Sequence, residues 1–62
     1  MKQIQLKQVP KGGLFRLSDS EFAPLWVRES YDRSLKKYGV YSYYNVNVFR
    51  FRRGDLLVFV ED

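Results

Sequence analysis

The sequence predicts a small all-β domain, and three observations lead to this prediction. Apolar and polar side chains alternate with a period of two in several segments, most clearly in residues 2–9 and 49–52. Glycine, proline and asparagine separate such segments at intervals of about 8–12 residues, as in small meanders and barrels. Aromatic residues make up 18% of the chain, and they favour pleated, half-buried strands. Residues 1–62 are therefore expected to form one small β domain.

The first half of the chain predicts three strands, at residues 2–9, 14–17 and 25–31. Pro10 ends the first of them, because proline lacks an amide donor and has a fixed φ. Ser18 and Glu21 have the spacing of a capping box, which allows one short helical turn at residues 19–23. Strict alternation along the third strand places Arg28 and Tyr31 on opposite faces.

The second half predicts further short strands at residues 38–44, 49–52 and 56–60. Asparagine tolerates left-handed backbone geometry, so residues 45–48 are expected to form a four-residue hairpin loop. Residues 53–55 form the next turn. The whole pattern predicts a five-stranded antiparallel meander or SH3-like barrel. The alternative is an open, strongly twisted sheet with one helical turn.

The predicted hairpin suggests a binding surface. If Tyr44 faces Phe49 across the loop, then Tyr43 faces Arg50 on the other side of the sheet. The next pair on that side is Tyr41 opposite Arg52. Tyrosine rings can stack on bases while guanidinium groups meet phosphates. The alternative is a structural ladder of cation–π pairs on a solvated face. The candidate binding surface comprises Tyr41, Tyr43, Arg50, Arg52, Arg53 and Arg28.

The opposite face of this hairpin is expected to belong to the core, because its side chains are phenylalanines. The core is predicted to contain Trp26, Phe49, Phe51, Val58 and Val60, with Tyr38 or Val40 beside them.

The charge distribution indicates an acidic or polyanionic partner. The chain carries 11 basic and 7 acidic residues, and residues 28–53 alone carry seven basic and two acidic ones. Two binding hypotheses follow. The first is a protein-interaction module that uses unpaired strand edges, with a protein partner or through self-association. The alternative is a nucleic-acid-binding module that holds single strands on the Tyr/Arg face.

The composition argues against several classes of function. The chain contains no cysteine and no histidine, so disulfides, the usual zinc sites and the commonest catalytic base and thiol nucleophile are excluded. We expect a non-enzyme without cofactor or small-molecule substrate. No apolar run reaches the length of a signal peptide or a membrane span, which favours a cytoplasmic location without membrane contact.

A series of short motifs runs through nearly the whole chain. They are, in order, Pro10-Lys11-Gly12 with Phe15, Trp26-Val27-Arg28, Tyr31-Asp32-Arg33-Ser34, Lys37-Tyr38, Gly54-Asp55 and Val58-Phe59-Val60. This series resembles short reading frames that are common in gut Bacteroidales genomes and in their phages and mobile elements. The resemblance implies a cytoplasmic, mobile-element type of protein that modulates a larger complex. It implies no site residues.

Overall fold

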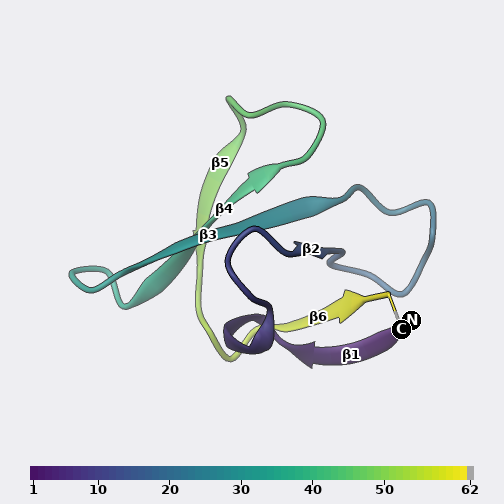
Figure 1. Ribbon diagram of the computed structural model, residues 1–62, viewed down its shortest axis with the longest axis horizontal. Coiled ribbons are helices and arrows are strands. Elements are labelled where there is room, and N and C mark those ends of the chain that lie inside the picture. Colours follow the sequence, from purple (N-terminus) through teal and green to yellow (C-terminus); the bar gives the residue numbers. More distant parts are fainter. Residues whose placement is uncertain (62) are drawn as a thin grey trace.

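The computed structural model describes residues 1–61, and within them it contains six β-strands and one short 3-10 helix (Figure 1). Every strand pairing is antiparallel, which confirms the all-β prediction, but the strand number is six rather than five. The elements are β1 (Lys2–Gln5), the 3-10 helix η1 (Leu6–Gln8), β2 (Leu14–Phe15), β3 (Trp26–Asp32), β4 (Lys37–Ser42), β5 (Phe49–Arg52) and β6 (Leu57–Val60).

The strands form two sheets that are joined at one point. One sheet has the order β1-β6 and the other has the order β2-β3-β4-β5. Arg16 and Phe59 exchange two backbone hydrogen bonds of 2.8 Å, which connect the end of β2 to β6. In Figure 1, β1 and β6 therefore run below β2, while β3, β4 and β5 lie above it. No pairing joins β1 to β5 in residues 1–61, so the barrel is not closed and both strands are edges.

The predicted helical turn at residues 19–23 is wrong. That segment forms turns instead, because the Ser20 hydroxyl accepts a hydrogen bond from the Phe22 N–H at 3.1 Å and so satisfies the backbone locally. The helical turn lies at η1, where the sequence predicts the end of the first strand. There the N–H groups of Leu6 and Lys7 donate to carbonyls of the turn that precedes β6, and this long-range bonding bends the chain.

The core lies between the β1–β6 sheet and the inner face of the larger sheet. Its buried members are Leu6, Val9, Phe15, Val40 and Val58, and the partly buried side chains packed against them are Ile4, Trp26, Tyr38, Leu56 and Val60. The core prediction is confirmed for Trp26, Val58 and Val60, with both Tyr38 and Val40 beside them. It is wrong for Phe49 and Phe51, which remain 41% and 39% exposed.

A bulge in β3 changes the predicted alternation of that strand. Arg28 lies opposite Val40 and Tyr31 lies opposite Tyr38, with a register shift between the two pairs. Because opposed residues share a face, Arg28 and Tyr31 lie on the same, inner side of the sheet rather than on opposite sides. The bulge thereby brings Tyr31 beside Tyr38.

Candidate functional site

The β4–β5 hairpin has a different register from the one that the sequence predicts. Tyr41 lies opposite Phe49, and Val40 lies opposite Arg50. The predicted pairing of Tyr43 with Arg50 is therefore wrong, and the same shift of three residues removes the pairing predicted for Tyr41. Because an odd shift exchanges the two faces of a strand, the predicted Tyr/Arg ladder does not exist.

The reason is the length of the hairpin loop, which covers residues 43–48 rather than 45–48. Two side chains stabilise turns in this longer loop by accepting hydrogen bonds from the backbone. The Ser42 hydroxyl accepts a hydrogen bond from the Tyr44 N–H at 3.2 Å, and the Asn45 carbonyl oxygen Oδ1 accepts one at 3.1 Å from the N–H two residues further on. Such local hydrogen bonds compete with the strand ladder and end it early.

The structure separates the two tyrosines of the predicted surface from most of its arginines. Tyr41 lies half-buried in β4, on the face that carries Phe49. Tyr43 lies in the hairpin loop, where its N–H donates to the Leu25 carbonyl and its ring contacts Tyr44 edge-to-face with centroids 5.3 Å apart. Neither ring is opposed to an arginine.

Three of the predicted arginines meet at the other end of the hairpin. Arg52 lies opposite Tyr38, and Arg28 lies over the same ring with its Cζ atom 4.2 Å from the centroid. Arg53 follows directly in the turn before β6, where it forms an ion pair with Asp55 at 3.0 Å. The structure thus groups Arg28, Arg52 and Arg53, with Arg50 in the middle of β5.

The outer face of the larger sheet carries an apolar surface. Leu14, Val27, Tyr41 and Phe49 follow one another across the four strands in register, and Phe51 lies next to Phe49 with ring centroids 5.2 Å apart. We call these five residues the outer apolar face. Val27 is 6% exposed, but Leu14, Phe49 and Phe51 are 39–43% exposed, and no further element covers them within residues 1–61.

Gly39 explains how the outer apolar face packs. A Cβ atom at Gly39 would lie only 2.6 Å from Cζ of Phe49, so the ring lies directly on the glycine backbone. Aromatic side chains commonly cover a strand glycine in this way. The tip of the Phe49 ring thus packs onto Gly39, and the Phe51 ring meets it edge-to-face at an interplanar angle of 74°.

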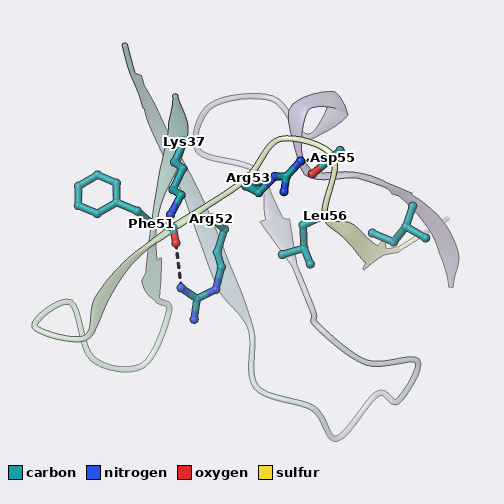
Figure 2. A pocket seen from close by; sticks show the side chains of 7 residues that line it. Lys37, Phe51, Arg52, Arg53, Asp55 and Leu56 are labelled. Atoms are coloured by element: carbon teal, nitrogen blue, oxygen red, sulfur yellow. Dashed lines mark hydrogen bonds and ion pairs between the residues drawn. The ribbon is translucent and has the colours of Figure 1, made fainter. Parts of the chain in front are cut away.

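Strand β5 forms the free edge beside this face. The Ser42 N–H donates to the Val48 carbonyl at 3.0 Å, so ladder bonds continue at every second residue and the peptide groups of Phe49 and Phe51 point away from β4. Nη1 of Arg50 donates to the Phe49 carbonyl at 2.8 Å. Nη1 of Arg52 donates to the Phe51 carbonyl, also at 2.8 Å, as Figure 2 shows. The edge carbonyls are therefore covered by the strand's own guanidinium groups, while the edge N–H groups are not.

Basic residues gather around the turn between β5 and β6. A shallow hollow of about 570 Å³ has Lys37, Arg52 and Arg53 in its lining, and Figure 2 shows these side chains around it. A neighbouring hollow of about 350 Å³ is lined by Lys7 and Lys36 and shares Arg53 and Asp55 with the first. We call Lys7, Lys36, Lys37, Arg52 and Arg53 the basic end.

Sequence reasoning missed Lys7, Lys36, Lys37 and Tyr31 at this end. The signal for Lys37 was the presence of two pairs of adjacent basic residues in the sequence. The observed register brings these pairs together, because the first residues of β4 lie beside the last residues of β5. Lys7 and Tyr31 had no such signal, because the first depends on the contact of η1 with a distant turn and the second on the bulge.

The described part of the chain gives no sign of a metal or membrane-spanning site. Within residues 1–61, no three or more histidine, cysteine, aspartate or glutamate side chains are grouped in a way that could hold a metal ion. No helix in that part is both long and apolar enough to cross a membrane.

Comparison of the chain with protein-family models, with curated proteins and with solved structures finds no match.

Proposed function

We propose that the chain is a non-enzymatic protein-interaction module that binds an extended acidic segment of a partner protein along β5. The observation that carries this proposal is the combination of a free strand edge with an uncovered apolar face beside it. An added strand would bond to the edge N–H groups of Phe49 and Phe51, and its apolar side chains would lie on the outer apolar face.

The acidic character of the partner follows from Arg50 and Arg52. Their guanidinium groups cover the carbonyls that an incoming strand must reach. Carboxylates on the partner would offer these arginines stronger, charge-assisted hydrogen bonds than a carbonyl does. The arginines could then leave the Phe49 and Phe51 carbonyls, which would accept the N–H groups of the partner. A neutral or basic strand would have no means of releasing them.

The same arginines oppose pairing between two copies of this chain. An antiparallel β5–β5 contact would bring Arg50 and Arg52 of one copy against those of the other, and like charges across a strand pair are destabilising. Both side chains are exposed and neither forms an ion pair within residues 1–61. A partner of opposite charge therefore fits better than self-association, although self-association remains an outcome that the experiment can detect.

The docking site needs only the free edge and the outer apolar face. The SH3-like barrel, the cytoplasmic location and the mobile-element type of role remain predictions. The proposed function is compatible with each of them.

The test uses peptides of about eight residues, the length of a typical strand, with alternating valine and glutamate. Binding is followed by the amide NMR signals and hydrogen exchange of the protein. We expect the N–H groups of Phe49 and Phe51 to shift and to become protected from exchange. Two peptides are then compared, methylated at the odd-numbered or at the even-numbered backbone nitrogens. One of them should not bind and the other should bind unchanged, because only every second amide of the added strand faces β5.

Two matched controls sharpen this experiment. Phe49→Ser should weaken binding, whereas Phe22→Ser should not, although Phe22 is 89% exposed, because it lies in the loop between β2 and β3 outside the outer apolar face. A peptide with lysine in place of glutamate should not bind. Perturbation confined to β1, concentration-dependent dimerisation without the peptide, or a methylation effect without alternation would each overturn the proposal.

A further inference from the structure

We propose a second binding function at a different place: the basic end holds the phosphodiester backbone of single-stranded nucleic acid, and Tyr31 stacks on a base. This site goes beyond the docking of a protein strand at β5. Its residues come from three separate parts of the chain, namely η1, the β3–β4 hairpin, and the end of β5 with the turn that follows it. These parts meet around two adjoining hollows.

Four of the five cations of the basic end form no ion pair within residues 1–61. Among the residues that line the two hollows, Asp55 is the one carboxylate within the described chain, and it is paired with Arg53. Lys7, Lys36 and Lys37 form no ion pair in residues 1–61. Asp32 lies opposite Lys37 on the neighbouring strand, and its carboxylate accepts a hydrogen bond from the Leu35 N–H at 3.0 Å but forms no ion pair within residues 1–61. The five cations outnumber these two carboxylates, and the remaining positive charge favours a polyanionic ligand.

The backbone that positions the cations is fixed. The Lys7 N–H donates to the Gly54 carbonyl at 3.0 Å, and a Cβ atom at Gly54 would lie 2.9 Å from Cε2 of Tyr38 and 3.2 Å from Cβ of Lys7. Glycine is therefore required for this close approach. The side chains of Lys7 and Tyr38 pack against the turn at Gly54, so the ligand would meet a preformed surface.

Lys36 occupies a conformation that a lysine adopts at a cost. Its φ is +55°, in the left-handed region, which L-residues adopt less readily than glycine does. A lysine at a position suited to glycine indicates that the charge has a use there, since strained backbone is concentrated at functional sites. The variant Lys36→Gly consequently separates function from stability.

Aromatic stacking distinguishes a nucleic acid from other polyanions. Tyr31 and Tyr38 line the smaller hollow together with Lys7 and Lys36, and their ring centroids lie 4.8 Å apart. Tyr38 is backed by the guanidinium of Arg28, whereas Tyr31 retains 45% of its surface exposed. A base can stack on Tyr31 while adjacent phosphates reach the lysines. Only an unpaired strand presents its bases in this way.

The test is fluorescence anisotropy with a labelled oligothymidylate over a range of salt concentrations. If all five cations of the basic end contact phosphates, log K should fall against log salt with a slope near −3.5, at about 0.7 per contact. Lys36→Gly should make this slope shallower by about 0.7 and weaken binding about eightfold at about 50 mM salt. Tyr31→Leu, which keeps an apolar side chain against Tyr38, should weaken binding about fivefold or more without changing the slope.

The matched control is Lys11→Gln. It removes the same charge, but Lys11 lies outside both hollows and is paired with Glu29 at 3.9 Å, so it should change neither affinity nor slope. Equal losses for Lys11→Gln and Lys36→Gly would show a response to net charge alone and would overturn the site. If polyglutamate bound as tightly as the oligonucleotide, and if Tyr31→Leu had no effect on binding, the nucleic acid would be overturned as the ligand. Lys36 and Tyr31 do not belong to the β5 docking site, so failure here leaves that proposal standing.

Discussion

Replacing Phe15 and Phe51 separately by alanine tests which face of the larger sheet is the core. Phe15 is 1% exposed and packs within the core cluster. Its truncation removes a buried ring and leaves a cavity, which costs about 3–5 kcal/mol of unfolding free energy. A chain of 62 residues has a total stability of roughly 3–9 kcal/mol, so this variant should lose between about one third and all of that stability.

Phe51→Ala should behave differently, because Phe51 is 39% exposed on the outer apolar face. Full burial of a phenylalanine contributes about 1.5–3 kcal/mol, and a side chain that hides about three fifths of its surface loses roughly 1–2 kcal/mol. No closed cavity forms at an open surface, so no further term is added. The two substitutions should thus differ by about 1–4 kcal/mol, with the greater loss at Phe15.

Urea denaturation followed by the fluorescence of Trp26 measures both variants. Trp26 is the one tryptophan of the chain and lies opposite Phe15, so its signal reports the core. If Phe15→Ala does not fold, the leucine variants replace it: Phe15→Leu should cost about 1–1.5 kcal/mol and Phe51→Leu less than about 0.5. Equal losses at positions 15 and 51 would refute the assignment of the faces and restore Phe51 to the core.

Three further substitutions test individual packing arguments with the same urea titration. Lys36→Gly should raise stability by about 0.5–1 kcal/mol because it relieves the left-handed φ of +55°, and a loss of stability would contradict this. Gly54→Ala should lower stability by about 1–3 kcal/mol, since its Cβ would meet Tyr38 at 2.9 Å, and a neutral result would show that the turn can move. Arg16→Ala should cost about 1.5–3 kcal/mol because the Arg16 side chain is 12% exposed and its guanidinium is bonded to Glu61. Glu61→Gln should cost less than about 1 kcal/mol because the Glu61 side chain is 73% exposed.

The sequence was sufficient to predict that β5 exists, with the bounds that the structure has, but not which of its faces is inner. Alternation shows that Phe49 and Phe51 share one side and Arg50 and Arg52 the other. The alternation identifies the core-facing side only for a strand that has one face buried. All four residues of β5 are exposed, because the strand lies at the edge of the sheet beyond most of the core. The usual rule, apolar inside, therefore fails here.

The basic end depended on contacts that no local pattern contains. The excess of positive charge in residues 28–53 was visible in the sequence, and it indicated the kind of partner. Its location required the true hairpin register, which brings Lys37 beside Arg52, and the bonding of Lys7 to a turn that lies about 47 residues later in the chain. Closing so long a loop is decided by the packing of the whole core rather than by residues near either end.

The two proposed sites adjoin at Arg52, and this has a thermodynamic consequence. Arg52 belongs to the edge that an acidic strand would occupy and to the basic end that an oligonucleotide would occupy. If its guanidinium is bound to a carboxylate, it is lost to phosphate, so each ligand should weaken the other by the same factor. One lost phosphate contact corresponds to about eightfold at about 50 mM salt.

Anisotropy titration of the oligonucleotide, with and without saturating acidic peptide, measures this coupling. Arg52→Met keeps the aliphatic stem beside Trp26 and Val40 but removes the charge. It should therefore weaken oligonucleotide binding in the absence of the peptide. Adding the peptide should then cause no further loss of affinity. Lys11→Gln should leave the coupling intact. If both ligands bind independently, Arg52 does not join the two sites, and each must then be judged on its own residues: Phe49 and Phe51 at the edge, Lys36 and Tyr31 at the basic end.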